Sequence, residues 1–251
     1  MNSNVLFVAL YSYLDKNKYS EDEIISEIEK CYKKGASMVH FHINKVKNGI
    51  VGFFNILKII EKLNILIAIS LSDYKEIMDN IGKNKITNLC SVSLHASSCK
   101  VFNNVINQEY NIVEERLKEY LKNGFIPELS IFNEKGIENA IKLDKKYHGK
   151  FIASIYLGYP NELEATIENI NMICSKLQDC SFLSIAIYNN NNLELTEEII
   201  KKNAIVRVGI EDSIYNGPQL AQNNEEVLDT VNKIINKLGR TVKKFEYKES
   251  L

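Results

Sequence analysis

The sequence predicts an α/β fold, a (β/α)8 TIM barrel that forms a single domain, and three observations support this prediction. Short apolar runs rich in β-branched residues alternate with amphipathic helical patterns along the whole chain. Eight such strand–helix units fit into 251 residues, which is the usual size of this barrel. The strand-like runs are almost continuously apolar, as expected for parallel strands covered on both faces.

Each expected element has a simple pattern in the sequence. The eight strands span residues 4–10, 36–42, 65–70, 89–95, 125–132, 151–157, 182–188 and 204–209. The first helix begins at Ser20, whose spacing to Glu23 is that of a capping box, and it ends before Gly35. The other seven helices span residues 53–63, 73–82, 110–122, 134–146, 161–177, 194–202 and 222–238.

A doubly wound open sheet is the alternative architecture for this alternating pattern. Neither G-x-G-x-x-G nor G-x-x-x-x-G-K-[ST] occurs in the chain, so no phosphate-binding motif supports the alternative. No Pro-, Gly- or Ser-rich stretch interrupts the pattern as a linker would. We therefore expect one domain over residues 1–251, with a polar C-terminal tail at about 244–251.

The composition excludes several classes of protein. Hydrophobic residues make up 45% and charged residues 25%, which is incompatible with wholesale disorder. Lys and Arg total 31 against 32 Asp and Glu, a balance that argues against a nucleic-acid partner. No apolar run approaches the roughly 20 residues that span a bilayer, and no basic leader precedes the first apolar run. The five cysteines include no C-x-x-C pair, so we expect reduced thiols and a cytoplasmic protein.

Two histidines at the end of the second expected strand predict a metal site. His40 and His42 are two residues apart, so their side chains point to the same face of a strand. Two imidazoles with one carboxylate suit zinc and leave a position open for substrate. Glu211 follows the eighth strand, which barrel closure brings near the first two. The alternative interpretation is a pair of unrelated buried histidines.

Other polar residues gather at the same ends of the expected strands, where barrels place their active sites. Arg207 in the eighth strand must be paired, either as a brace with Asp212 or as part of an acid–base cluster that holds a substrate carboxylate. Glu128 lies in the apolar fifth strand, as a structural or a functional acid. Ser70 ends the third strand and His95 ends the fourth. His95 is either a site residue or an ordinary histidine at a strand end.

Three segments together resemble the β-keto acid cleavage enzyme family. They are GASMVHFHINK, PELSIFNEKGI and IVRVGIEDSIYNGPQLAQNNEEVLDTVNKIINKLGRTV, in the family's order and at compatible spacing. The resemblance runs from residue 35 to about 243. It implies a zinc-containing TIM barrel, and the family's best known member acts in lysine fermentation.

The resemblance also implies roles for individual residues. His40, His42 and Glu211 match the zinc ligands, and Arg207 and Asp212 match the acid–base cluster. Glu128 and Ser70 match the acid of strand five and the serine ending strand three, and we expect both to be catalytic. Ser70, His95 and Asn133 are the residues that we expect to contribute to substrate binding.

The implied reaction is an acyltransferase-type carbon–carbon cleavage. A β-keto acid condenses with acetyl-CoA, and cleavage of the adduct gives acetoacetate and a new acyl-CoA by Claisen and retro-Claisen steps. Zn²⁺ is the implied cofactor, acetyl-CoA the cosubstrate, and a homotetramer the implied assembly.

The chain departs from the family pattern at several places. SLSDY, residues 70–74, replaces a glycine-rich loop after strand three, and Asn44–Lys45 replaces an Arg–Asp pair. The acid that the family carries after the first strand is missing unless Asp15 takes its place. Two alternatives therefore stay open: a zinc-binding structural or regulatory subunit without this catalysis, and a zinc hydrolase or aldolase on the same barrel.

Overall fold

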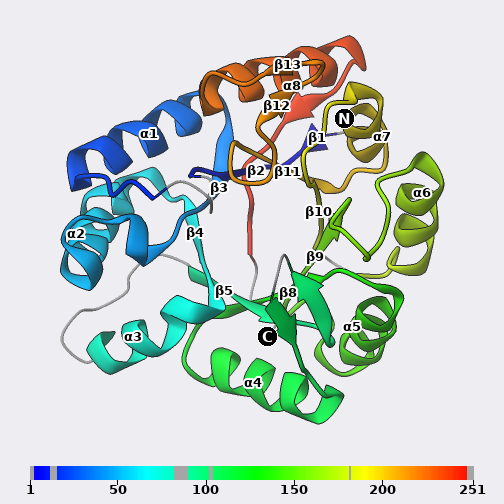
Figure 1. Ribbon diagram of the computed structural model, residues 1–251, viewed down its shortest axis with the longest axis horizontal. Helices are drawn as coiled ribbons and strands as arrows, with labels where there is room; N and C mark the ends of the chain where they lie inside the picture. Colours follow the sequence, from blue (N-terminus) through cyan, green and yellow to red (C-terminus); the bar gives the residue numbers. More distant parts are fainter. Residues whose placement is uncertain (1–2, 12–15, 82–89, 102–103, 181, 248–251) are drawn as a thin grey trace.

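Eight parallel strands close into a barrel in the computed structural model, which describes residues 3–11, 16–81, 90–101, 104–180 and 182–247. Figure 1 looks along the barrel, with the helices as an outer ring. The barrel strands, in chain order, are β2 (Leu6–Ala9), β3 (Ala36–His40), β4 (Leu66–Ile69), β5 (Cys90–His95), β8 (Ile126–Ile131), β9 (Ile152–Leu157), β10 (Leu183–Ile187) and β11 (Ile205–Val208). Each pairs in parallel with the next, and β11 pairs with β2, so the predicted (β/α)8 barrel is confirmed.

Helices follow the strands in the predicted order, and the second begins at Gly49 rather than at residue 53. They are α1 (Glu21–Lys33), α2 (Gly49–Ile60), α3 (Leu71–Ile81), α4 (Tyr110–Lys122), α5 (Glu134–Tyr147), α6 (Ile167–Lys176), α7 (Leu193–Lys201) and α8 (Asn224–Lys237), with 3-10 turns at Ile43–Lys45 and Glu61–Leu63. None of the helices in the described ranges is long and apolar enough to cross a membrane.

Side-chain caps explain where α1 and α6 begin. At α1 the Ser20 hydroxyl accepts the Glu23 amide, while the Glu23 carboxylate accepts the Ser20 amide at 2.7 Å, so the predicted capping box is present. The expected start of α6 at residue 161 is wrong, because Thr166 caps the helix by accepting the Asn169 amide. The expected helix end at residue 82 and strand start at residue 89 lie outside the described residues.

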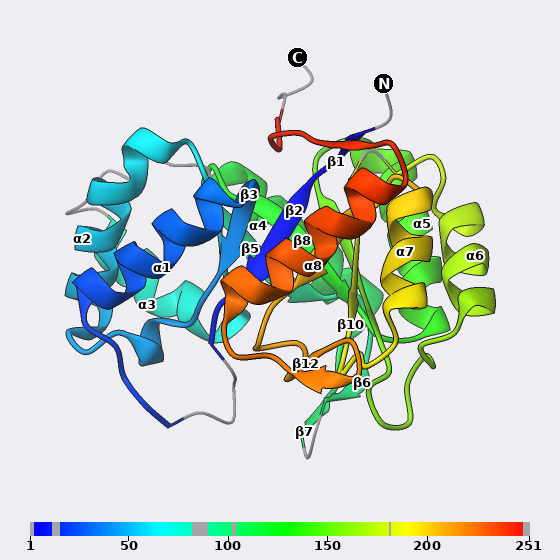
Figure 2. The same cartoon turned by 90° about the horizontal axis from the view of Figure 1, so that it is seen from above.

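Three pairs of short strands, two antiparallel and one parallel, were not expected from the sequence. β6 (Cys99–Val101) pairs with β7 (Asn104–Ile106), and β12 (Tyr215–Asn216) pairs with β13 (Gln219–Leu220). β1 (Ser3–Asn4) pairs with β14 (Thr241–Val242). Figure 2 shows β7 and β12 at one end of the barrel and β1 at the other.

Apolar side chains fill the amino-terminal end of the barrel interior. Phe7, Met38, Leu66 and Ile152 form one cluster there, and Phe245 from the C-terminal segment packs against it. The Phe245 amide donates a hydrogen bond to Ser37 Oγ at 2.9 Å. The segment expected as a polar tail therefore contributes a buried ring, and its last residues, 248–251, lie outside the described part. With this end packed, the carboxyl ends of the strands are left for a site.

Gly209, directly after β11, is held against the first strand. Its φ is +138°, and a Cβ atom placed on it would lie 2.1 Å from the carbonyl oxygen of Ala9. This close approach fixes the path of the chain between Arg207 and Glu211.

We expect Gly209→Ala to lower the free energy of unfolding by about 3 kcal/mol, because backbone strain and a backbone clash add. For a chain of this size the melting temperature should fall by roughly 6–12 °C, measured by calorimetry. Gly124→Ala is the control, since Gly124 also has a positive φ of +79°, but apart from its chain neighbours no described residue has an atom within 4 Å of its Cβ position. An equal loss in both variants would contradict the packing argument.

Candidate active site and metal centre

A cavity of about 430 Å³ opens at the carboxyl ends of the barrel strands. This is a usual size for a small-molecule site. The following residues line it: His40, His42, Ser70, Leu71, Ser72, Ser93, His95, Val101, Asn104, Ile106, Ser130, Phe132, Tyr156, Tyr159, Arg207, Glu211 and Asp212. Most of the candidate residues from the sequence therefore meet in one place.

Three of these side chains form a compact triangle of ligand atoms. His40 Nε2 lies 3.3 Å from His42 Nε2 and 3.2 Å from Glu211 Oε1, and His42 Nε2 lies 3.4 Å from Glu211 Oε1. Ligand distances of about 2.0–2.1 Å around a tetrahedral zinc ion imply ligand–ligand edges of about 3.3–3.4 Å. Among the described residues this is the one group of three or more acidic, His or Cys side chains suited to a metal ion.

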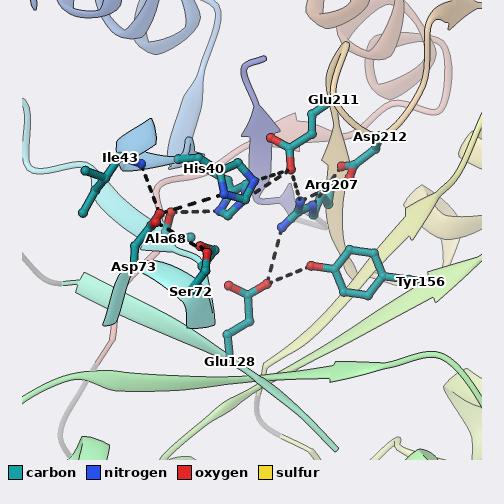
Figure 3. Close-up of polar contacts among 12 residues, drawn as sticks. His40, Ile43, Ala68, Ser72, Asp73, Glu128, Tyr156, Arg207, Glu211 and Asp212 are labelled. Atoms are coloured by element: carbon teal, nitrogen blue, oxygen red, sulfur yellow. Dashed lines mark hydrogen bonds and ion pairs between the residues drawn. The ribbon is translucent and has the colours of Figure 1, made fainter. Parts of the chain in front are cut away.

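Hydrogen bonding orients His40 for this role. Its Nδ1 lies 2.9 Å from the carbonyl oxygen of Ala68 on β4, so Nδ1 carries the proton and donates it. The lone pair is then on Nε2, which points toward Glu211 in Figure 3. A metal-binding histidine is commonly oriented by a carbonyl group in this way.

The charges of the triangle also fit a cation. Burial disfavours the charged form of His40, but the adjacent Glu211 carboxylate raises the pKa of His40 above its usual value. Burial acts to raise the pKa of Glu211, but the two imidazoles hold it well below its usual range, so Glu211 is ionised. Glu211 Oε2 is buried and has no hydrogen-bond partner within the described ranges, which leaves it available to a bound ion.

A carboxylate that sequence reasoning missed lies behind His42. Asp73 in the first turn of α3 is buried, and its Oδ2 accepts the Ile43 amide at 3.1 Å and lies 3.9 Å from His42 Nδ1 (Figure 3). Asp73 belongs to the segment SLSDY, residues 70–74. An acid three residues beyond the end of strand three was the signal available in the sequence. This segment thus places a carboxylate beside a candidate metal ligand.

We expect Asp73→Asn to weaken zinc binding about 10–100-fold, because the amide keeps an oxygen for Ile43 but loses the negative charge beside His42. Competition with a chelator of known affinity measures this change. Asp79→Asn, on an exposed position of the same helix, is the matched control and should leave the affinity unchanged. Equal zinc affinity in all three proteins would show that Asp73 only anchors the backbone.

Arg207 connects two carboxylates beside the triangle. Its Nε and Nη2 donate to the two oxygens of Asp212 at 2.8 and 3.2 Å, a two-pronged ion pair. Its Nη1 lies 3.5 Å from Glu128 Oε1, and its Nη2 lies 3.9 Å from Glu211 Oε1 (Figure 3). Burial alone lowers the pKa of Arg207, but Asp212 outweighs it and raises the pKa well above its usual value. The expected pairing is therefore present, and it lines the same cavity as the triangle.

Glu128 lies beneath the cavity rather than in its lining. It is fully buried, and it accepts hydrogen bonds from Tyr156 Oη and Ser91 Oγ, both at 3.4 Å. Its contact with the reacting centre passes through Arg207. Tyr156, near the end of β9, was also missed, although the rule applied to the other strand ends would have found it.

The three remaining sequence candidates lie in different settings. Ser70 lines the cavity, and its hydroxyl is 2.6 Å from that of Ser72. His95 lines the cavity but is not part of the metal triangle. Asn133 lies outside the lining: its Oδ1 caps α5 by accepting the Gly136 amide, and its Nδ2 donates to Glu162 at 3.1 Å.

The fold and the site together define a (β/α)8 barrel with a candidate metal centre at the carboxyl ends of its strands. The model of the beta-keto acid cleavage enzyme family matches residues 19–248, and the chain belongs to this family. The resemblance drawn from the sequence is thereby confirmed.

Two curated relatives carry the name 3-keto-5-aminohexanoate cleavage enzyme. The protein from Acetoanaerobium sticklandii is 23% identical over 239 residues, and that from Fusobacterium nucleatum is 21% identical over 243 residues. Each alignment covers 89% of this chain and 86% of the relative. Relatives of this chain are therefore enzymes that cleave β-keto acids.

Solved structures show the same barrel at low sequence identity. A ternary complex of ObcA with a C4-CoA adduct and oxalate has a TM-score of 0.70 at 13% identity, covering 90% of this chain. This chain spans 65% of the ObcA chain. A phospho-2-dehydro-3-deoxyheptonate aldolase from Thermotoga maritima has a TM-score of 0.58 at 11% identity, covering 96% of this chain and 72% of the aldolase. At these identities the similarity concerns the fold.

Proposed function

We propose that the chain is a zinc-dependent enzyme that condenses a β-keto acid with acetyl-CoA and releases acetoacetate and a new acyl-CoA. The observation that carries this proposal is the triangle of His40, His42 and Glu211 in one cavity with the Arg207–Asp212 pair. Family membership supplies the reaction class. Zinc, acetyl-CoA and the two products are our proposal.

Zinc held by the triangle would act as a Lewis acid that polarises the keto oxygen and stabilises negative charge developing there. Beside it, Arg207 lines the cavity, and its Nη1 forms an ion pair with Glu128 at 3.5 Å but no hydrogen bond within the described ranges. A guanidinium group in that state suits the carboxylate of the substrate. Arg207 would thus bind one end of the β-keto acid while the triangle faces its keto group.

Asp212 is our candidate for the group that transfers the proton. It lines the cavity, and Arg207 fixes the orientation of both its oxygens. We propose that Asp212 takes the proton from the carbon between the keto and carboxyl groups. Glu128 does not reach the cavity and would act as a positioning residue that holds Arg207.

The remaining steps need no reactant other than the β-keto acid and acetyl-CoA. The deprotonated carbon attacks the thioester carbonyl of acetyl-CoA, forms a carbon–carbon bond and expels the thiolate of coenzyme A. That thiolate then attacks the original keto carbon. The bond between this carbon and the carbon that attacked acetyl-CoA breaks, and the keto carbon becomes the carbonyl carbon of the new acyl-CoA. The electron pair returns to the carbon of the leaving acetoacetate, which takes up a proton.

The test combines elemental analysis of the purified protein with an acetoacetate assay that uses acetyl-CoA and a panel of β-keto acids. We expect one zinc ion per chain and acetoacetate formation with at least one acid. One zinc ion without turnover would favour the non-catalytic or hydrolase and aldolase alternatives. Absence of zinc would overturn the proposal. A cytoplasmic homotetramer without nucleic-acid partners stays a prediction.

A further inference from the structure

The cavity has a charged side and an apolar side. The charged side consists of the metal triangle and the Arg207–Asp212 pair. The apolar side, as we use the term, consists of Val101, Ile106, Phe132 and Tyr159. These four residues belong to one apolar cluster. Ring centroids of Phe132 and Tyr159 lie 5.2 Å apart in an edge-to-face arrangement, which gives this side a defined shape.

The apolar side carries no ionised group. Among the described residues that line the cavity, those outside the charged side are serines, Asn104, His95, tyrosines and apolar residues. Burial, with a smaller contribution from Arg116, lowers the pKa of His95 to about 4, so this imidazole is neutral near pH 7. Burial also raises the pKa of Tyr159, which keeps its hydroxyl neutral.

The carboxylate of Glu162 is already engaged in hydrogen bonds with neighbouring groups of the protein. Glu162 accepts the Lys100 amide of β6 at 2.7 Å and the Asn133 side-chain amide at 3.1 Å. It does not line the cavity. Among the described residues of the lining, an ammonium group on a substrate would therefore meet no ionised partner at the apolar side, and burying an unpaired charge is strongly unfavourable.

We propose that the substrate is a 3-oxo acid whose chain beyond the keto group is uncharged and apolar and lies against Val101, Ile106, Phe132 and Tyr159. The inference rests on the proposed function, because the triangle and Arg207 must already hold the keto and carboxylate groups. The chain beyond the keto carbon then faces the uncharged part of the described lining, of which the apolar side is the hydrophobic portion. The substrate differs in this respect from the amino-substituted acid named for the two curated relatives.

The direct test compares two acids of equal length, 3-oxohexanoate and 5-amino-3-oxohexanoate, with the zinc-loaded full chain. We expect kcat/KM for the first to exceed that for the second by about 100-fold or more. Across 3-oxopentanoate, 3-oxohexanoate and 3-oxoheptanoate, kcat/KM should rise about four-fold for each methylene buried. Comparable values for the amino acid and its unsubstituted counterpart would overturn the inference and leave the proposed function intact.

Strand β7 offers a matched pair of variants. Ile106 lines the cavity, whereas the side chain of Val105 is exposed to solvent, as alternation along a strand requires. Ile106→Asp places a carboxylate on the apolar side and should reduce kcat/KM for 3-oxohexanoate while raising it for the amino-substituted acid. Val105→Asp adds the same charge outside and should change neither value. A parallel loss for both acids in Ile106→Asp would count against the inference.

Binding to the zinc-loaded protein, measured by calorimetry, separates the two proposals. The protein could form no acetoacetate from any acid and still bind 3-oxohexanoate more tightly than the amino-substituted acid. This result would overturn the proposed reaction but support the apolar side as the recognition surface. Equal binding of the two acids, or binding of neither, would overturn the inference whatever the turnover.

Discussion

His42→Ala should lose the metal ion and, with it, nearly all turnover. The substitution removes one corner of a triangle whose edges of 3.2–3.4 Å match a single tetrahedral ion, and it leaves two ligands facing an open space. Loss of the Lewis acid should lower kcat by on the order of 1,000-fold, because such an ion supplies several kcal/mol of stabilisation to the developing charge. Elemental analysis after dialysis and the acetoacetate assay measure the two effects.

His148→Ala is the control for this substitution. The His148 side chain is 65% exposed, and it lies after α5 beside Asp144, away from the cavity lining. Zinc content and turnover should equal those of the unchanged protein. If His42→Ala retained a full complement of zinc, the assignment of the three ligands would be wrong, and the two histidines would be ordinary buried residues of the barrel.

The barrel could be predicted because its signals are local. Continuous apolar runs and amphipathic helices occupy successive short segments, and the Ser20–Glu23 cap lies within four residues. The pairs β1–β14 and β6–β7 have strands of two or three residues, which are too short for a period, and β1–β14 joins opposite ends of the chain. Such pairs are determined by the tertiary fold and not by a local pattern.

In the candidate site, too, some residues could be predicted from local patterns, whereas others are brought in by the tertiary fold. His40 and His42 could be placed together because alternation along extended backbone is a local rule, although β3 ends at His40 and His42 follows it in extended conformation. Asp73 reaches His42 from a different strand–helix unit, and no spacing in the sequence reports that contact. Asn133 was expected to bind substrate, yet its spacing to Gly136 is that of a helix cap, and this local role occupies its side chain. Which strand-end residues turn toward the cavity is decided by packing.

Arg207→Lys should fold and bind zinc but lose on the order of 100- to 1,000-fold in kcat/KM. Lysine keeps the positive charge, so Asp212 and Glu128 do not become unpaired buried charges, which is the costly outcome. An ammonium group cannot, however, donate two parallel hydrogen bonds to Asp212 while it also presents a planar donor toward Glu128 and the substrate. Steady-state kinetics, with melting temperature and zinc content measured in parallel, test this expectation.

Arg240→Lys is the matched control, since Arg240 donates to Asn4 Oδ1 and the Lys201 carbonyl at the packed end of the barrel. It can lose some stability, but turnover per folded molecule should be unchanged. Unchanged turnover in Arg207→Lys as well would mean that Arg207 only braces the barrel. A loss confined to Arg207→Lys, with zinc retained, would place the function of this arginine at the substrate, because neither folding nor the metal centre would account for it.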